Sequence, residues 1–508
     1  MESRGQWGTR AGFVLAAVGS AIGLGNIWRF PAVAYENGGG AFFIPYLIAL
    51  LTAGIPILIM EFTLGHKYQG SAPLTFRRMN KKLEWLGWWQ IFIAFVISTY
   101  YAVIVAWAIS YAVFSFNLAW GSDTESFLFK NYLKAAPAGE VGSLVPGVLI
   151  PLVLVWAVAL FFLVRGIKKG IEIANRIFIP LLVVVFLIIV IRAVTLDGAS
   201  LGLQAFFEPD WSRIFKGEVW VAAYGQIFFS LSIAFAIMIT YASYLPRKSD
   251  IVNNAFITGL SNSGFELLAG IGVFAALGFM ASVSGVPVKE VVAGGIGLAF
   301  VVFPQIINEF PIWNGFFGLL FFLSLVLAGI TSLISILETY ISGVSDKFGI
   351  SRKKSVFIGG GLAAIVSLLF ATNGGINFLD AVDYFINQFG IAFVGLVEVI
   401  IIAWFLRKLT DLKEHANAIS DMRVGTWWNI CLGIITPLIL GYMLFDLFKT
   451  NLLKQFKTET GTGNYGGYSD SFILYSGWSV VIGVIVLGII VSLTKWNRST
   501  LDQHREDE

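Results

Sequence analysis

The chain has 508 residues, of which 57% are hydrophobic and only 13% charged, with a mean hydropathy of +0.79. Soluble domains carry about 25% charged residues, so this supply is too small to cover a water-facing surface of this size. Intrinsic disorder is excluded because disordered chains combine low hydrophobicity with high charge. The net charge of +3 gives no reason to expect nucleic acid as a partner. The composition therefore predicts a polytopic helical membrane protein.

Charge-poor runs of about 20 residues are long enough to cross a bilayer as helices. Twelve such runs occur, at 11–34, 41–65, 86–118, 146–164, 172–192, 219–244, 255–282, 314–342, 355–371, 377–406, 427–448 and 472–494. A further apolar stretch, 291–308, is short and begins with glycines, so we expect a re-entrant or surface hairpin there. Neither a soluble domain nor a cleavable signal peptide is expected.

The positive charges predict which ends of the helices face the cytoplasm. If the N-terminus is cytoplasmic, 24 of the 34 lysines and arginines fall on that side and nine on the other, with Arg29 inside the first span. Cytoplasmic loops carry an excess of lysine and arginine. We therefore predict cytoplasmic N- and C-termini, which an even number of spans requires.

The cysteine and histidine residues indicate neither a disulfide nor a metal centre. Cys431 is the only cysteine, so no intrachain disulfide can form. His66, His415 and His504 lie far apart in the sequence, and we predict no metal site from them.

Two of the predicted spans are unusual for plain membrane helices. The first places Gly19, Gly23, Gly25 and Asn26 at mid-membrane depth, followed by Arg29. Close helix packing through small residues would explain the glycines, whereas the polar side chains are costly in lipid and mark a transport pathway. The sixth span has Gln226, Ser230 and Ser232 in a corresponding position. Paired discontinuities in the two halves of a transporter indicate its binding site.

Six motifs in the chain resemble the neurotransmitter:sodium symporter family. They are Trp7-Gly8-Thr9-Arg10, Gly25-Asn26-Ile27-Trp28-Arg29-Phe30-Pro31, Glu36-Asn37-Gly38-Gly39-Gly40-Ala41-Phe42, Gln226-Ile227-Phe228-Phe229-Ser230-Leu231-Ser232, Tyr241-Ala242-Ser243-Tyr244 and Ala328-Gly329-Ile330-Thr331-Ser332. The resemblance implies twelve transmembrane helices in the leucine-transporter type of fold, an all-α 5+5 inverted repeat with broken helices one and six. The implied segments are a cytoplasmic N-terminus (1–10), a first repeat (11–192), an extracellular loop (193–218), an inverted second repeat (219–406), two further helices (407–494) and a cytoplasmic tail (495–508).

The same resemblance implies two sodium sites built from neutral oxygens. The first would use the Ala21 carbonyl and the side chains of Asn26, Ser230 and Asn262, and the substrate carboxylate would complete it. The second would use the carbonyls of Gly19, Ile22 and Ala328 with the hydroxyls of Thr331 and Ser332. Because ion and substrate would touch at the first site, each would favour binding of the other.

A bound amino acid would lie between the two broken helices. The residues that the resemblance implies around it are Ala21, Leu24, Gly25, Ile97, Tyr101, Phe229, Ser232, Phe235, Ser332 and Ile336. None of these is charged, so a neutral, small or hydrophobic side chain is expected. Ala234 and Ala236 stand where the leucine transporter has glycines. Their methyl groups are expected to stiffen the break and narrow the pocket, which favours small aliphatic substrates over large aromatic ones.

Gates and an unwinding helix complete the implied machinery. The resemblance implies an outer gate of Arg29 with Asp383 and an inner gate of Arg4 with Asp346, the latter supported by Trp7 and Tyr244. Gly170 and Pro180 match a family pattern where span five can unwind.

Two glutamates are expected within the membrane. Glu266 lies four residues after Asn262, on the same helix face, at a position near which animal members bind chloride. A carboxylate there predicts chloride-independent transport, with proton exchange as a further option. Glu61 is expected to bond amides freed by the break in helix one or to be structural.

The sequence therefore predicts a sodium-coupled symporter of a neutral amino acid in a cell membrane, and the short loops favour a prokaryotic inner membrane. No enzyme activity and no organic cofactor are expected, since no nucleophile–base, metal or phosphate-binding constellation occurs. Two alternatives stay open. One is a proton-coupled carrier of the same fold, against which Thr331 and Ser332 argue. The other is a non-transporting amino-acid sensor.

Overall fold

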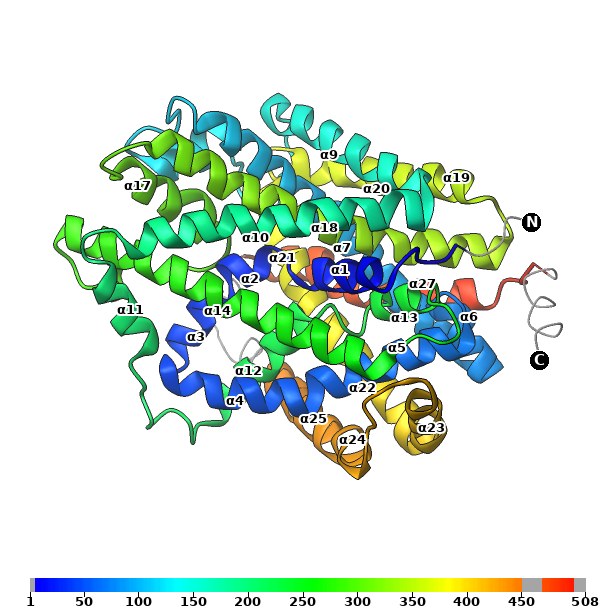
Figure 1. Ribbon diagram of the computed structural model, residues 1–508. Coiled ribbons are helices and arrows are strands. Elements are labelled where there is room, and N and C mark those ends of the chain that lie inside the picture. Colours follow the sequence, from blue (N-terminus) through cyan, green and yellow to red (C-terminus); the bar gives the residue numbers. More distant parts are fainter. Residues whose placement is uncertain (1–4, 450–467, 498–508) are drawn as a thin grey trace.

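The structure is a computed structural model that describes residues 5–449 and 468–497. These residues form helices joined by short connections, and the described part of the chain contains no strand beyond two isolated bridges, Gly39 with Pro209 and Leu144 with Thr372. The helices run roughly along one direction in a single bundle (Figure 1). This arrangement confirms the predicted all-helical membrane architecture.

Within the described residues, ten helical stretches are long and apolar enough to cross a membrane. They are Gly40–Tyr68 (ending in α5, Ile55–Tyr68), Lys81–Phe114 (mostly α7, Glu84–Phe114), Pro146–Val164 (α9), Ile167–Val194 (mostly α10, Glu172–Val194), Ile251–Ser284 (α14), Asn314–Phe348 (α18), Arg352–Ala371 (with α20, Gly361–Ser367), Gly375–Phe405 (with α21, Gly375–Phe385, and α22, Ala392–Ile400), Thr426–Phe448 (with α25, Thr436–Phe448) and Asp470–Ser492 (with α27, Ser479–Ser492). Each overlaps one predicted span.

The first predicted span is broken. It forms α1 (Arg10–Ala21) followed by α2 (Leu24–Trp28) and α3 (Phe30–Glu36), with a bend of 54° between the two parts. At the break, Gly23 is fully extended (φ −120°, ψ −168°), and its freed amide donates to Asn26 Oδ1 at 2.8 Å. The asparagine that is costly in lipid therefore caps the second half of its own helix.

The sixth predicted span, 219–244, is broken more widely. It forms α12 (Gly217–Ser230) and α13 (Ile237–Ala242), separated by a short irregular segment. Within that segment Ser232, Ala234 and Ala236 have φ values of +53°, +67° and +71°. This left-handed conformation costs an L-residue about 1–2 kcal/mol, so surrounding contacts must hold the segment open.

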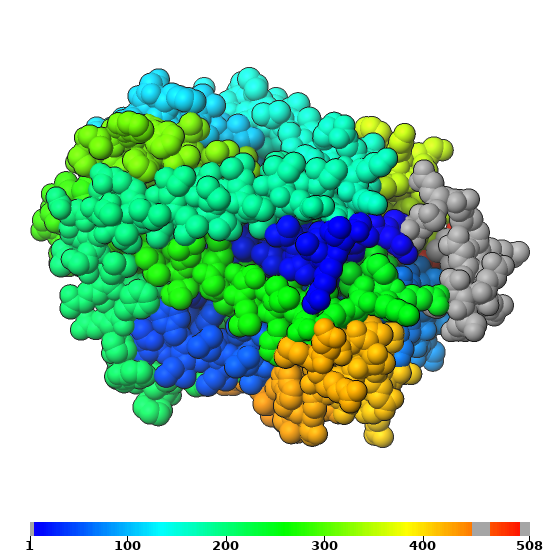
Figure 2. Space-filling model, in the orientation of Figure 1, coloured from blue at the N-terminus to red at the C-terminus, as the bar shows by residue number. Residues whose placement is uncertain are grey.

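The stretch at 291–308 is a helix, Gly295–Asn308, that ends in α17 (Phe303–Asn308) and follows the one-turn α15 (Val288–Val291). In Figure 1, α17 and α11 (Ala199–Phe207) lie at one end of the bundle, and both ends of the described chain lie at the other. The Trp7 amide donates to the Tyr244 carbonyl at 3.1 Å there. Figure 2 shows the N-terminal segment in dark blue on the surface between α10 and the green residues of α13 and α14.

The amphipathic helix α23 (Leu409–Ile419) packs against α5 and α14 at the same end as the chain termini. His66 Nδ1 on α5 lies 3.0 Å from His415 Nε2 on α23, and His66 Nε2 lies 3.0 Å from the Pro246 carbonyl oxygen. Because a carbonyl only accepts, His66 donates through Nε2 and accepts at Nδ1 from His415. Two histidines that are far apart in sequence are thus brought into contact.

This histidine pair predicts a weaker fold at acid pH. Burial, and then the charges of His66 and Lys67, lower the pKa of His415 from 6.5 to about 4, while Asp411 opposes the shift. The unfolded chain binds the proton first, so this part of the stability is complete above about pH 6.5 and is lost as the pH falls towards 4. We expect the unfolding temperature in detergent to fall across this range. His415→Gln should flatten that part of the profile, and parallel profiles for the two proteins would contradict the prediction.

Candidate functional site

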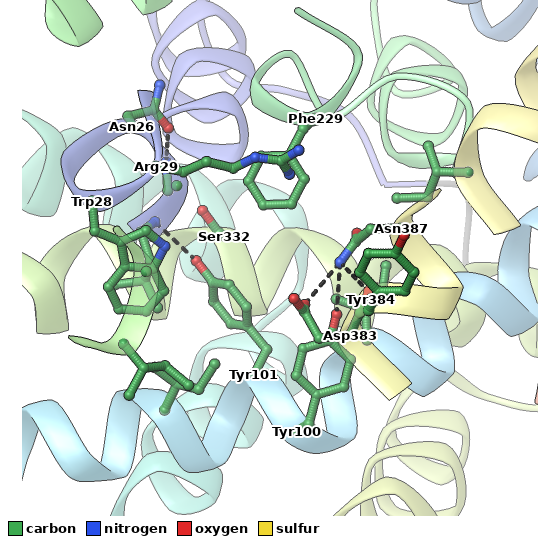
Figure 3. Close-up of a pocket in the computed structure, with 18 of the residues that line it drawn as sticks. Asn26, Trp28, Arg29, Tyr100, Tyr101, Phe229, Ser332, Asp383, Tyr384 and Asn387 are labelled. Carbon is green, nitrogen blue, oxygen red and sulfur yellow. Dashed lines mark hydrogen bonds between the residues drawn. The ribbon is translucent and has the colours of Figure 1, made fainter. Parts of the chain in front are cut away.

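A cavity of about 570 Å³ lies between the two broken helices and the faces of α7, α18 and α21. Figure 3 shows side chains from these elements pointing into it. All ten predicted substrate-binding residues line this one cavity: Ala21, Leu24, Gly25, Ile97, Tyr101, Phe229, Ser232, Phe235, Ser332 and Ile336. Residues from distant parts of the chain thus converge on a single space at the helix breaks.

The break in the first span brings bare backbone to the cavity wall. The Leu24 amide donates to the Tyr101 hydroxyl at 3.4 Å (Figure 3). A Cβ atom on Gly23 would lie 3.1 Å from that hydroxyl and 3.2 Å from Ser332 Oγ. Amide groups at the start of α2 are therefore presented to the cavity with the positive end of a helix dipole, as an anionic ligand group requires.

The ring of Phe229 leaves no room for a side chain at position 25. A Cβ atom at position 25 would lie 2.1 Å from Phe229 Cε1, far inside van der Waals contact. Gly25→Ala is therefore expected to displace the ring into the cavity and to reduce substrate affinity at least about fivefold, since overpacking typically costs about 1–3 kcal/mol. Substrate titration of the purified protein measures this. Gly264→Ala is the matched control, because a Cβ there meets nothing within 4 Å, and equal losses in both variants would contradict the argument.

The predicted ligands of the first sodium ion form a connected chain of polar side chains. Asn26 Nδ2 donates to Asn262 Oδ1 at 2.8 Å, and Asn262 Nδ2 donates to Ser230 Oγ at 3.1 Å. All three side chains are buried. The structure thus brings together oxygens from the first span, α12 and α14.

The predicted ligands of the second sodium ion also meet. Ser332 Oγ lies 3.3 Å from the Gly19 carbonyl oxygen and 3.4 Å from that of Ile22. Thr331 Oγ1 donates to the Leu327 and Ala328 carbonyls of its own helix, both at 3.0 Å, so of the two hydroxyls it is Ser332 that contacts the first span. Carbonyl groups of unwound backbone, together with hydroxyl groups, are suited to a hard monovalent cation, because they supply oxygens without fixed charge.

Ser20 is part of this cluster, although the sequence did not single it out. Its carbonyl accepts from Ser232 Oγ at 2.7 Å and lies 3.4 Å from Ser332 Oγ. The hydrogen bond from Ser232 joins the two breaks directly. A movement of one broken helix would therefore alter a contact of the other.

Of the two roles expected for Glu61, the bond to amides of the break in helix one is not the one found. Its Oε1 accepts from the Ala234 amide at 2.6 Å, so the carboxyl group caps the break in span six, and among the described residues no bond joins it to the break in helix one. The reason is geometric, because the left-handed turns at 232–236 free amides that point towards α5. The other oxygen, Oε2, has no hydrogen-bond partner within the described part of the chain.

Ala234 and Ala236 also differ from expectation. Both are fully buried, and neither lines the cavity. The Ala234 methyl group lies towards Gly395 on α22. The two methyl groups therefore do not narrow the pocket, and their effect is confined to the strained backbone of the break.

Glu266 is fully buried among hydrogen-bond donors. It accepts from the Tyr46 hydroxyl and from Gln226 Nε2 at 2.7 Å, and the Tyr46 hydroxyl also lies 2.8 Å from Ser263 Oγ. No described lysine or arginine lies within 4.0 Å of the carboxylate. An unpaired carboxyl group with donors on two sides thus lies one helical turn from Asn262.

The predicted outer gate residues lie apart on the cavity wall. The Arg29 guanidinium stacks 4.5 Å from the centroid of the Phe229 ring, and Asp383 accepts from Asn387 Nδ2 at 2.8 Å. Arg29 and Asp383 both line the cavity, and no ion pair within 4.0 Å joins them (Figure 3). The cavity is therefore continuous past the gate residues towards the α17 end.

The opposite end is closed by a buried polar network. Trp7 Nε1 donates to the Tyr241 carbonyl at 2.8 Å, and the Tyr244 hydroxyl donates to Glu338 Oε1 at 2.7 Å. Glu338 is paired with Arg352 through two bonds of 2.8 and 2.6 Å. Of the predicted inner gate, Asp346 accepts from the Ser71 amide at 2.9 Å, and Arg4 lies outside the described residues.

The expected unwinding region of span five is at its first turn. Gly170 lies in a π-helical turn, Ile167–Ile171, where a Cβ would lie 1.9 Å from the Phe162 carbonyl oxygen. Pro180 lies inside α10, where it removes a helical hydrogen bond.

Sequence reasoning missed several parts of the cavity wall. The missed residues are Trp28, Tyr100, Ile104, Gly294, Gly295, Ile296, Gly297, Leu379, Asp380, Tyr384, Asn387, Gln388 and Ile391. The expectation of a wall without charge holds only for the inner part, since Arg29, Asp380 and Asp383 line the outer part. The i, i+3, i+4 spacing of 380, 383, 384 and 387 on one helix face was the available signal.

Comparison with known proteins agrees with this geometry. A model of the sodium:neurotransmitter symporter family matches residues 4–140 and 122–497. An uncharacterized sodium-dependent transporter of Methanocaldococcus jannaschii is 41% identical over 96% of this chain and 97% of its own length. The sodium- and chloride-dependent GABA transporter 2 of Homo sapiens is 30% identical over 97% of this chain and 86% of its own length.

The crystal structure of MhsT in complex with L-phenylalanine is similar to this fold. The TM-score is 0.75 at 31% sequence identity, covering 88% of this chain and all of that one. The two broken helices and the ten apolar spans are therefore those of the leucine-transporter fold, in a multi-pass membrane protein. The chain belongs to the sodium:neurotransmitter symporter family and is a sodium-dependent transporter.

Proposed function

We propose that the protein imports a neutral amino acid together with sodium by alternating access, with two sodium sites and no requirement for chloride. The observation that carries this proposal is the convergence of ten predicted substrate-binding residues on one cavity between the helix breaks. MhsT, whose fold is similar, was crystallised with an amino acid, L-phenylalanine.

The chemistry of the cavity wall supports a zwitterionic ligand. The α-carboxylate would accept from the amides at the start of α2 and from the Tyr101 hydroxyl, and the α-amino group would meet the carbonyls of Ala21, Phe229 and Ser232. The rest of the inner wall is apolar, and Ile97, Phe235 and Ile336 would contact the side chain. Binding would favour an uncharged, hydrophobic amino acid.

Sodium would be a transported substrate as well as a ligand. At the first site it would bridge the substrate carboxylate and the cluster of Asn26, Asn262 and Ser230. At the second it would join the Gly19 and Ile22 carbonyls to Thr331 and Ser332. Occupancy of both would hold α1 against α18 until the inner end opens, so the sodium gradient would supply the driving force.

The continuous cavity at the α17 end favours an outward-facing arrangement, with that end outside the cell and the termini in the cytoplasm. Closing would bring Arg29 from Phe229 towards Asp383. Opening would separate Trp7 from Tyr241 and Tyr244. Lysines and arginines that gather at the end with the termini support this orientation, and the short loops favour a prokaryotic inner membrane.

The test is binding and proteoliposome uptake with all twenty amino acids, in sodium and with choline in its place. We expect a neutral amino acid to be taken up only with sodium. Uptake driven by a proton gradient in choline would identify a proton-coupled carrier, and binding without uptake would identify a sensor. Either outcome would contradict the proposal.

Substrate size is a separate prediction. Because Ala234 and Ala236 hold the break in a strained, stiff conformation, we expect alanine, valine or leucine to compete for uptake more strongly than tryptophan. Replacing both alanines by glycine should relax the break and improve competition by phenylalanine and tryptophan relative to leucine. Strongest competition by tryptophan in the unmodified protein would contradict this prediction.

A further inference from the structure

A groove of about 490 Å³ lies between the start of α7 and the end of α27, away from the substrate cavity. We call it the α7–α27 groove. It is lined by Lys81, Lys82, Glu84, Trp85, Ile489, Ser492 and Leu493. We propose that this groove binds the phosphate headgroup of an anionic phospholipid from the surrounding bilayer.

The groove lies at the depth of lipid headgroups. The helical stretch Lys81–Phe114 has 34 residues, about 50 Å at 1.5 Å per residue, whereas the hydrocarbon core is about 30 Å thick. The first turns of this stretch therefore extend beyond the hydrocarbon. The last membrane helix ends beside them, at Ser492. Trp85 is half-buried at this level, where aromatic side chains mark the boundary between headgroups and hydrocarbon.

The charge of the groove is positive and unpaired. Lys81 and Lys82 are exposed, and within residues 5–449 and 468–497 neither makes an ion pair. The third charged residue, Glu84, is buried and already neutralised by Lys347 and Arg77, the latter at 2.8 Å. Its two oxygens also accept from the indoles of Trp88 and Trp496. The two free ammonium groups are thus available to an anion.

The apolar wall suits an acyl chain. Ile489, on α27, is 44% exposed, and Leu493, the residue that caps the end of this helix, is 81% exposed. The helix faces outward along most of its length. Ammonium groups on one side and an open aliphatic surface on the other match the two parts of a phospholipid, whereas a free phosphate ion would use only the first. The complementarity therefore selects a lipid.

The test measures lipid retained by the full-length protein purified in detergent, using native mass spectrometry and added dioleoyl phosphatidylglycerol or dioleoyl phosphatidylcholine. We expect the phosphatidylglycerol complex to be preferred, and K81Q/K82Q to weaken it about thirtyfold, as expected for two basic residues at a membrane surface. The control K353Q/K354Q removes an exposed lysine pair from the same end of the molecule and should leave retention unchanged. Circular dichroism and gel filtration check that both variants are folded.

Three results would overturn the proposal. Equal retention by K81Q/K82Q and the control would show that the lysines are not the site. Displacement of the lipid by millimolar inorganic phosphate would identify a free anion as the ligand. A gain in retention on deleting residues 498–508, with no effect of K81Q/K82Q in the full chain, would show that the acidic tail occupies the groove instead. Trp85→Phe tests where the lipid binds. Brominated phosphatidylglycerol should quench the tryptophan fluorescence of the unmodified protein more than that of this variant.

Discussion

Ser332→Ala is expected to shift the sodium dependence of substrate binding by about 10- to 150-fold towards higher sodium. The hydroxyl lies within 3.4 Å of three carbonyl oxygens of the first span, those of Gly19, Ser20 and Ile22. Removing one oxygen from the shell of a buried cation costs about 1.5–3 kcal/mol, the range for a hydrogen bond to a charged group. Without the ion, the backbone at the break between α1 and α2 would lose this contact with α18.

Sodium titration of binding at saturating substrate measures this shift. Ser332 also lines the substrate cavity, so Thr331→Ala is a needed second variant, because Thr331 does not line it and should change the sodium dependence alone. Ser324→Ala is the matched control, since this buried hydroxyl on the same helix bonds only the Phe321 carbonyl among the described residues. If Ser332→Ala and Thr331→Ala kept the same sodium dependence as the Ser324→Ala control, no sodium ion would bind at these two hydroxyls and the prediction would be wrong.

Glu266→Ser is expected to make transport depend on chloride. The substitution removes a buried negative charge but leaves the donors of Tyr46 and Gln226 facing the space it filled. Leaving a nearby sodium ion without its counter-charge costs about 3–5 kcal/mol, so uptake in gluconate should fall at least about a hundredfold and recover in chloride. Uptake by proteoliposomes with either anion inside and outside measures the effect.

Glu266→Gln is the control for this experiment. It preserves the size of the side chain and one of its two acceptor oxygens, so it has neither the charge nor the room for an anion, and it should stay inactive in both salts. The unmodified protein should transport equally in chloride and gluconate. A loss of its activity without chloride would remove the basis of the prediction.

The broken helices illustrate how far sequence reasoning reaches. Gly23 and Asn26 predicted the first break because a flexible residue and a polar one at mid-membrane depth need a partner other than lipid. The structure supplies that partner locally, as the Gly23 amide donates to Asn26 Oδ1. The second break had a weaker signal, because serine and alanine are tolerated in helices, and its left-handed residues became visible only in the backbone.

The polar contacts between helices were less predictable. Glu61 caps the break in span six through the Ala234 amide, and His66 meets His415 across 349 positions of sequence. Neither pairing follows from spacing, since each depends on how two helices are rotated and placed against each other. The part of the outer cavity wall formed by residues 294–297 was missed for the same reason.

The sequence by itself determined the membrane class, the positions of the helices and, through family motifs, the residues around the cavity. These properties are local, because apolar length, charge and a glycine-rich break act within one segment. Only the tertiary structure decided which carboxyl group meets which freed amide, that Arg29 stacks on Phe229 away from Asp383, and that the cavity stays continuous at one end. Those outcomes depend on packing between segments hundreds of residues apart, where fractions of an ångström decide which polar groups are satisfied.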